Sequence, residues 1–287
     1  MLEQRAQTNA QQNGQATATV RDALRAAAQR FAAVESETPR LDADLLLAEV
    51  LGCDRAALYV EPERGLSAAE LARYEELVRR RETREPVAYI TGRKAFRYLE
   101  LHIDERVLVP RPETELLVEI ALELPSGARV VDVGTGSGVV ALSLKHERPD
   151  MEVVGVDFDE NALAVAQDNR DRLGLDVAFR HSDLLEDVDW EVDAVVANLP
   201  YIDPDELPDL YPELRAEPRT ATLAEDHGLA LIRRLVSQAG DVPMLALEVG
   251  REQAAAVREI VSRGGFTDVE THWDLAGIER AVVGRRR

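Results

Sequence analysis

Three glycines, Gly134, Gly136 and Gly138, occur at every second position in VVDVGTGSGVV (residues 130–140), between a predicted strand and a predicted helix start. Glycines at such a junction permit a tight turn and let a ligand lie directly against the backbone. A dinucleotide fingerprint would need a glycine where this chain has Val139, and a P-loop would need a following GKS or GKT. The loop therefore predicts a ligand site that is neither a dinucleotide site nor a P-loop.

Two carboxylates near this loop narrow the choice of ligand. Asp132 precedes the first glycine by two residues, a poor place for a pyrophosphate but a suitable one for a cationic amino-acid group. Asp157 ends the next predicted strand, about 20 residues beyond the loop, where a carboxylate accepts hydrogen bonds from ribose hydroxyls. Each alone could be a strand-end or helix-cap carboxylate. Together with the glycines they favour S-adenosylmethionine, a nucleoside that carries ammonium and sulfonium groups.

Further cofactor contacts are expected from neighbouring positions. Thr135 and Ser137 complete the glycine loop. Asp183 follows the third predicted strand of the same region and either contacts the adenine amino group or is a loop carboxylate that faces water.

A second segment, Asn198-Leu199-Pro200-Tyr201, follows an apolar predicted strand. The lone pair of an amide or exocyclic amino nitrogen is delocalised, so a site must hold the NH2 group with acceptors and turn the lone pair toward a methyl donor. The Asn198 side-chain oxygen and the Leu199 carbonyl are the expected acceptors, and Tyr201 packs on the planar group. Alone, the segment could be a β-turn. Beside the glycine loop, all four residues are expected to bind substrate, with Asn198 and Tyr201 catalytic and Asn198 also bordering the cofactor.

Four regions surround these residues. Residues 1–17 are polar without apolar periodicity and predict a disordered tail. Residues 18–88 predict a helical domain for substrate recognition. Residues 89–110 predict a β-hairpin linker, because apolar and polar residues alternate on both sides of Asp104-Glu105. Residues 111–287 predict the catalytic domain.

Apolar spacing predicts the elements of both domains. In the helical domain, helices are expected over 20–34, 41–52 and 67–82, the last with Ser67 and Glu70 as a capping box. In the catalytic domain, strands (128–133, 152–157, 177–181, 193–199 and 244–249) alternate with helices (137–147, 161–174, 228–240 and 251–265), and 266–273 with 279–285 predict a closing antiparallel pair. This alternation predicts an α/β fold with a mostly parallel sheet and a ligand site at the carboxyl ends of its strands.

The chain resembles the protein-(glutamine-N5) methyltransferases that modify peptide chain release factors. The resemblance runs from about residue 20 to the C-terminus, and its segments are DVGTGSG, NLPY and residues 84–96, 107–119, 217–236 and 274–280. PRPETE, from Pro110 to Glu115, is especially characteristic of the family. The resemblance implies a class I S-adenosylmethionine-dependent methyltransferase fold, Rossmann-like, with a mostly parallel seven-stranded sheet and a small N-terminal helical domain.

The same resemblance implies methylation of the glutamine side-chain nitrogen in the Gly-Gly-Gln motif of class I release factors, with Thr114 touching the cofactor. Two positions depart from the family. Leu199 stands at the second position of the usual Asn-Pro-Pro-Tyr, which keeps the carbonyl but loses one fixed φ angle. Leu184 stands where some members have an aromatic residue, so adenine is expected to pack on an aliphatic surface. The alternatives are a ribosomal-protein glutamine, adenine N6 of nucleic acid, and a non-catalytic binding module.

Composition restricts partners and location. With 54 acidic and 34 basic residues the net charge is -20, which repels polyphosphate and argues against direct nucleic-acid contact. No apolar run approaches the ~20 residues of a membrane span, and the polar first residues lack a signal sequence, so a cytoplasmic protein without membrane contact is expected. Cys53 is the only cysteine and the histidines form no HxxH pattern, so neither disulfides nor a metal site is expected.

The basic residues are almost all arginine, since only Lys94 and Lys145 are lysines. A GC-rich genome and a surface adapted to high salt both explain this composition. Adaptation to salt predicts that the Tm rises from dilute to molar KCl, because screening weakens self-repulsion among acidic groups. Thermal unfolding across a KCl series tests this. A Tm that stays flat or falls favours genome composition.

Overall fold

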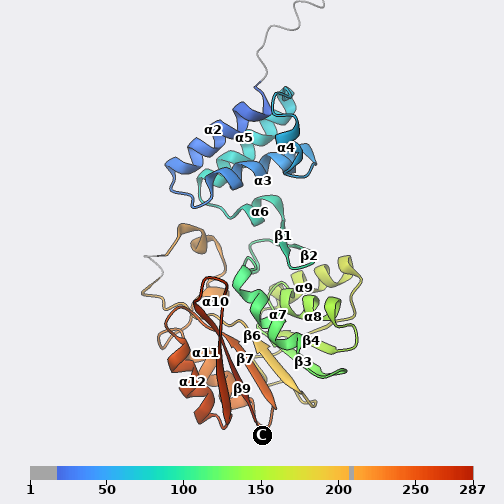
Figure 1. Cartoon of the computed structure of the whole chain (residues 1–287), viewed down its shortest axis with the longest axis vertical. Coiled ribbons are helices and arrows are strands. Elements are labelled where there is room, and N and C mark those ends of the chain that lie inside the picture. The colour runs from blue at the N-terminus through green and yellow to red at the C-terminus, as the bar shows by residue number, and fades with distance from the viewer. Residues whose placement is uncertain (1–17, 207–209, 287) are drawn as a thin grey trace, which may run out of the picture. The chain divides into compact units, whose positions relative to one another are not determined.

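The computed structural model describes residues 18–206 and 210–286. The predicted disordered tail, residues 1–17, lies outside the described residues. The chain divides into two compact units, of which the first ends at Thr91 and the second begins at Gly92 (Figure 1). The segment predicted as a hairpin linker lies mostly in the second unit.

The first unit is helical and buries one apolar core. Its helices are α2 (Val20–Ala33), α3 (Pro39–Leu51), α4 (Ala57–Val60), α5 (Ala68–Glu82) and α6 (Val87–Thr91). The predicted capping box of α5 is confirmed, since Ser67 Oγ accepts from the Glu70 N–H and the Glu70 carboxylate accepts from the Ser67 N–H. This cap satisfies backbone donors that a helix start leaves unpaired. Leu24, Phe31 and Leu46 are among the residues that fill the core.

A buried ion pair joins two helices of this unit. Arg81 on α5 donates from Nε to Asp42 Oδ2 on α3 at 2.8 Å, and both residues are 4% exposed. The Ser36 hydroxyl donates to Asp42 at 2.7 Å and accepts from Arg81 Nη2 at 3.0 Å. Because a buried charge is costly unless it is paired, these contacts tie α3 to α5 at one register.

The hairpin pairs β1 (Arg93–Phe96) with β2 (Leu99–His102). Its turn lies at Arg97–Tyr98, so the turn expected at Asp104-Glu105 is wrong. Arg97 has a left-handed φ of 49°, a conformation that usually requires glycine or asparagine in a turn. Its guanidinium binds Glu147 at 2.6 Å. This ion pair holds the turn. Because its two residues are fifty positions apart, the local sequence does not indicate a turn at Arg97. Asp104 instead accepts from the backbone N–H two residues later, in a separate turn.

The second unit is built on a seven-stranded sheet (Figure 1). Its strands are β3 (Arg129–Val133), β4 (Glu152–Asp157), β5 (Ala178–His181), β6 (Ala194–Ala197), β7 (Met244–Glu248), β8 (Asp268–Trp273) and β9 (Glu279–Arg285). They lie in the order β5-β4-β3-β6-β7-β9-β8, and only β9 is antiparallel to both its neighbours. The five predicted strands and the closing antiparallel pair are confirmed. The chain order reverses at β3, where ligands of doubly wound sheets bind.

Helices cover both faces of this sheet (Figure 1). Helices α7 (Glu115–Leu122), α8 (Val139–Glu147) and α9 (Glu160–Leu173) lie on one side, and α11 (Ala230–Gln238) and α12 (Ala254–Arg263) on the other. Shorter turns, η1 (Pro112–Thr114), η3 (Pro212–Ala216) and α10 (Arg219–Thr222), occur in the connections. The four predicted helices are present with shifted ends. Over residues 18–206 and 210–286, none of the helices is long and apolar enough to span a membrane.

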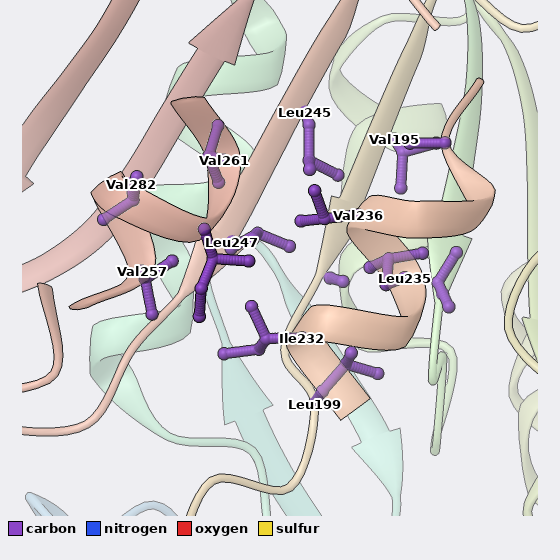
Figure 2. Close-up of a cluster of buried hydrophobic side chains, with 14 of the residues drawn as sticks. Val195, Leu199, Ile232, Leu235, Val236, Leu245, Leu247, Val257, Val261 and Val282 are labelled. Carbon is purple, nitrogen blue, oxygen red and sulfur yellow. The ribbon is translucent and has the colours of Figure 1, made fainter. Parts of the chain in front are cut away.

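The core under α11 and α12 reaches the loop that follows β6 (Figure 2). Val195 and Leu245 come from the sheet and Ile232 from α11. Leu199, which is 4% exposed, packs in the same cluster near Ile232. The leucine that replaces the family proline is therefore an anchor that holds its loop by apolar contact.

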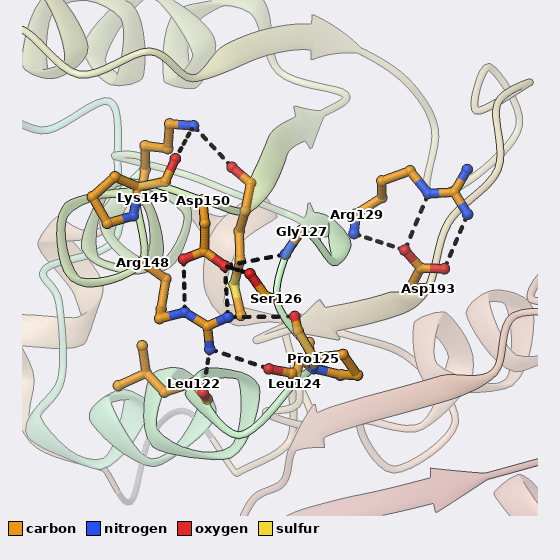
Figure 3. Close-up of polar contacts among 12 residues, drawn as sticks. Leu122, Leu124, Pro125, Ser126, Gly127, Arg129, Lys145, Arg148, Asp150 and Asp193 are labelled. Atoms are coloured by element: carbon orange, nitrogen blue, oxygen red, sulfur yellow. Dashed lines mark hydrogen bonds and ion pairs between the residues drawn. The ribbon is translucent and has the colours of Figure 1, made fainter.

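Polar contacts brace the amino ends of the central strands (Figure 3). Arg129, the first residue of β3, binds the Asp193 carboxylate through Nε at 3.1 Å and Nη2 at 3.0 Å. Arg148 donates to the Leu122 carbonyl at 2.7 Å and pairs with Asp150. Parallel strands carry their ligand sites at the carboxyl ends, so these contacts stiffen the sheet without occupying the ligand edge.

Replacing the loop anchor by Leu199→Ala should destabilise the protein by about 2–5 kcal/mol, because the truncated side chain leaves a cavity in a packed core. Leu275→Ala is the matched control, since Leu275 is fully exposed, and should change the free energy of unfolding little. Urea unfolding followed by circular dichroism measures both. Equal stability of the two variants would contradict the anchoring role.

Candidate functional site

A cavity of about 280 Å³ opens at the carboxyl ends of β3, β4 and β6. The predicted site residues that line it are Gly134, Gly136, Asp157, Asp183, Leu184, Asn198, Leu199 and Pro200. They come from four separate connections, and the sheet order brings them to one edge.

The glycine loop presents bare backbone to this cavity. The N–H groups of Gly134 and Thr135 donate to the Val156 carbonyl at 2.9 and 3.0 Å, which fixes the loop against β4. Gly134 has a φ of 70°, and a Cβ there would lie 3.1 Å from Leu199 Cδ2. A Cβ on Gly136 would meet nothing within 4 Å, so that residue faces open space. The loop therefore has the close-approach geometry that a ligand needs.

Asp157 is held in place by backbone amides. Its carboxylate accepts from the Gly136 N–H at 2.9 Å and from the Asp159 N–H at 3.0 Å. Burial raises its pKa, while these two bonds favour the charged form. A fixed, largely buried carboxylate on the cavity wall is an acceptor for vicinal hydroxyls.

Phe158, which follows this carboxylate, was missed by the sequence analysis. It lines the cavity and is 53% exposed, so it offers an aromatic face to a planar ring. Leu184 lines the same cavity, as expected for an aliphatic surface. The available signal was an aromatic residue directly after the carboxylate that ends β4.

Five predicted cofactor residues do not line the cavity. These are Thr114, Asp132, Thr135, Ser137 and Gly138. Asp132 is 2% exposed, and its Oδ2 accepts from the Thr135 hydroxyl at 2.6 Å and from the Ala141 N–H at 3.2 Å. Burial raises its pKa to about 6. These contacts join the loop to the first turn of α8. Asp132 therefore acts as a helix-cap carboxylate, which was the other interpretation of this residue from the sequence.

Asp183 has a partner that the sequence did not indicate. Its carboxylate accepts from Arg234 Nη2 on α11 at 2.8 Å, and both residues line the cavity. The ion pair is half-exposed, so it remains accessible to solvent and ligands.

A second cavity, of about 470 Å³, adjoins the first. Asn198, Leu199 and Pro200 line both cavities, and Tyr201 lines the second. The predicted catalytic segment therefore forms a wall between the first cavity, which holds the glycine loop and Asp157, and the second cavity, which could hold another ligand.

Hydrogen bonds orient the catalytic segment. Asn198 donates from Nδ2 to Thr114 Oγ1 at 3.0 Å, which fixes which end of its amide faces the cavities. Burial raises the pKa of Tyr201, so its phenol stays protonated and donates to Glu248 Oε1 at 3.5 Å. Gln253 donates from Nε2 to the Tyr201 carbonyl at 2.9 Å. Glu248 and Gln253 were missed, because only the fold brings them to this loop.

Arg111, which lines the second cavity, forms an ion pair with a buried carboxylate. Arg111 binds the Glu217 carboxylate, whose side chain is fully buried and also accepts from the Val109 N–H at 3.3 Å. Burial raises the Glu217 pKa, and the Arg111 charge opposes that rise. This pair joins the PRPETE segment to the connection before α10.

The residues that line the first cavity fit an organic cofactor. Within residues 18–206 and 210–286, no group of three or more His, Cys, Asp or Glu side chains is arranged to hold a metal ion. The open backbone at Gly136, the fixed Asp157 carboxylate and the Phe158 ring match the adenosine part of S-adenosylmethionine.

The fold and the two joined cavities define a class I S-adenosylmethionine-dependent methyltransferase. Residues 112–214 match the methyltransferase small domain, and residues 22–92 match the PrmC N-terminal domain. The fold is also that of the hMettl16 catalytic domain, crystallised with the MAT2A 3'UTR hairpin 6. That likeness has a TM-score of 0.54 and 16% identity, over 76% of this chain and 82% of that chain.

Full-length relatives identify the family. The chain is 40% identical to a release factor glutamine methyltransferase of Koribacter versatilis (strain Ellin345), over 93% of this chain and 99% of the relative. It is 37% identical to that of Escherichia coli (strain K12), over 87% of this chain and 93% of the relative. The chain belongs to the release factor glutamine methyltransferase family.

Asp157→Ala should weaken S-adenosylmethionine binding by at least about tenfold, because it removes a charged acceptor for the ribose hydroxyls. Isothermal titration calorimetry measures this affinity. Asp176→Ala is the matched control, since Asp176 is exposed and lines neither cavity. An unchanged affinity in Asp157→Ala would remove this residue from the cofactor site.

Proposed function

We propose that this chain transfers a methyl group from S-adenosylmethionine to the side-chain nitrogen of the glutamine in the Gly-Gly-Gln segment of class I peptide chain release factors. The observation that carries this proposal is the wall of Asn198, Leu199 and Pro200 shared by both cavities. It puts hydrogen-bond acceptors at a place where a methyl donor in one cavity and an amide in the other would meet. Family membership supports the choice of substrate.

Three groups of the protein would hold the target amide. The Asn198 Oδ1 and the Leu199 carbonyl accept its two N–H bonds, since Asn198 Nδ2 is already engaged by Thr114. Tyr201 restricts the amide plane. Gln253 holds its backbone carbonyl, and its hydroxyl donates to Glu248. When bound, S-adenosylmethionine supplies an electrophilic methyl group on a sulfonium centre. Because the amide nitrogen is weakly basic, alignment of its lone pair provides most of the acceleration.

For the cofactor, we propose that Gly136, Asp157 and Phe158 hold the nucleoside. Asp157 would accept from the ribose hydroxyls and Phe158 would cover the adenine. We also propose that Asp183 contacts the adenine. Its carboxylate would then accept from Arg234 and from the adenine amino group at the same time.

Charge supports a protein substrate. The net charge of -20 opposes a nucleic-acid backbone, so we propose no direct nucleic-acid contact. Since release factors act in translation, the proposal places the protein in the cytoplasm.

Incubation of the enzyme with labelled S-adenosylmethionine and recombinant release factor tests the proposal. Peptide mass spectrometry should locate the label on the Gly-Gly-Gln glutamine. Label only on a ribosomal-protein glutamine would favour the alternative substrate. Cofactor binding without transfer to either protein would favour a binding module.

Asn198→Ala should lower kcat by about 100-fold or more with a much smaller change in cofactor affinity, because its main bond is to the target amide. Tyr201→Ala should lower turnover less, since it orients the amide without holding its protons. Tyr98→Ala is the matched control, because Tyr98 is 74% exposed and lines neither cavity. Full activity in Asn198→Ala would refute the mechanism.

A further inference from the structure

The side chain of Gln253, in the turn between β7 and α12, spends both of its donors and its carbonyl oxygen on backbone groups. Its Oε1 accepts from the Gly250 N–H at 2.9 Å. Its Nε2 donates to the Tyr201 carbonyl at 2.9 Å and to the His227 carbonyl at 3.0 Å. Because the amide oxygen faces an N–H and the amide nitrogen faces two carbonyls, only one orientation of the amide satisfies all three partners.

The three partners of this amide lie in three different connections of the second unit. Tyr201 follows β6, His227 precedes α11 and Gly250 follows β7. All three residues line the second cavity together with Gln253, and none of the four lines the first cavity. Gln253 therefore joins three segments of the second cavity to one another.

The three connections approach one another closely. A Cβ on Gly228 would lie 1.9 Å from the Tyr201 carbonyl oxygen, and a Cβ on Gly250 would lie 3.0 Å from Tyr201 Cδ2. His227 has a left-handed φ of 54°. A residue other than glycine keeps such a conformation only where its surroundings hold the backbone. The hydrogen bond from Gln253 to the His227 carbonyl is one such support.

The chain directly after Tyr201 is held by backbone bonds. The Ile202 N–H donates to the Thr222 carbonyl at 3.1 Å, and the Ala224 N–H donates to the Ile202 carbonyl at 2.9 Å. The Tyr201 hydroxyl donates to Glu248 at 3.5 Å, which is long for a hydrogen bond. The shorter bond from the Gln253 amide to the Tyr201 carbonyl is therefore the stronger polar constraint on Tyr201 itself.

We propose that Gln253 is a positioning residue that sets the place of Tyr201, and with it the shape of the second cavity, for the substrate amide. The inference rests on the proposed function, because the place of Tyr201 affects the rate only if Tyr201 packs on a target amide. Gln253 touches neither the cofactor cavity nor the reacting atoms of the proposed reaction. Its effect on the rate acts through the backbone of Tyr201.

Gln253→Met keeps a similar volume and removes all three hydrogen bonds. The kcat/KM for the release factor should fall about tenfold or more, while the Kd for S-adenosylmethionine should change by less than about twofold. Gln238→Met is the matched control. Gln238 is also half-buried and accepts from a backbone N–H, that of Leu185 at 2.9 Å, but it lines neither cavity. This control should keep the wild-type kcat/KM.

Gln253→Glu tests the donated hydrogen bonds through a pH profile. Its ionised carboxylate can still accept from the Gly250 N–H but has no proton for the two carbonyls, whereas its neutral carboxyl regains one O–H donor. The ratio of variant to wild-type kcat/KM should therefore rise as the pH falls toward the pKa of the introduced carboxyl. For Gln253→Met the ratio should stay flat, because His227 and the other titrating groups are common to all three proteins. A ratio for Gln253→Glu that does not rise contradicts the proposal.

Hydrogen exchange separates this inference from the proposed function, since it needs no turnover. The Ile202 and Ala224 amides should exchange faster in Gln253→Met than in the wild type or in Gln238→Met, because loss of the bond to Tyr201 loosens the loop. Unchanged exchange, or a Gln253→Met enzyme with wild-type kcat/KM, would overturn the positioning role. If exchange rises as expected while the wild type methylates no release factor, the proposed function fails and Gln253 still holds the Tyr201 loop.

Discussion

The parallel pairing of β3 with β6 is the constraint on which the rest of the site depends. Its register sets Val133 opposite Ala197, so the glycine loop and the catalytic segment leave the sheet side by side although more than sixty residues separate them. The two loops are in close contact, because a Cβ on Gly134 would lie only 3.1 Å from Leu199 Cδ2. Because these two loops touch and Asn198 lines both cavities, the proposed cofactor and the proposed substrate amide would meet beside Asn198.

Around this contact, buried polar groups act as supports. Asp132 ties the glycine loop to α8, Asp157 fixes Gly136, and Gln253 holds the Tyr201 carbonyl. Each satisfies backbone or side-chain partners that would otherwise be costly to bury. Asp157 and Gln253 also line the cavities, whereas Asp132 lines neither and holds the glycine loop from behind.

The departure of this chain from the family loop has a structural compensation. A proline would restrict φ at position 199, whereas Leu199 restricts the loop by packing into the core beside Ile232. Its backbone carbonyl remains available for the target amide. The glutamine-binding geometry can therefore be kept by apolar anchoring from one side of the loop and by the Asn198–Thr114 bond from the other.

The sequence by itself determined the sheet and most helix positions, and it selected the glycine loop, Asp157 and the Asn198–Tyr201 segment as candidate site residues, because periodicity and loop chemistry are local. It placed Thr114 and Asp132 at the cofactor, since nothing local distinguishes a lining carboxylate or hydroxyl from one that braces the loop behind it. It missed the Arg97 turn, Phe158, Glu248 and Gln253. Phe158 had a local signal directly after Asp157, whereas only the tertiary structure decided the Arg97 turn, Glu248 and Gln253, because their partners lie on other elements and burial, not residue type, sets their roles.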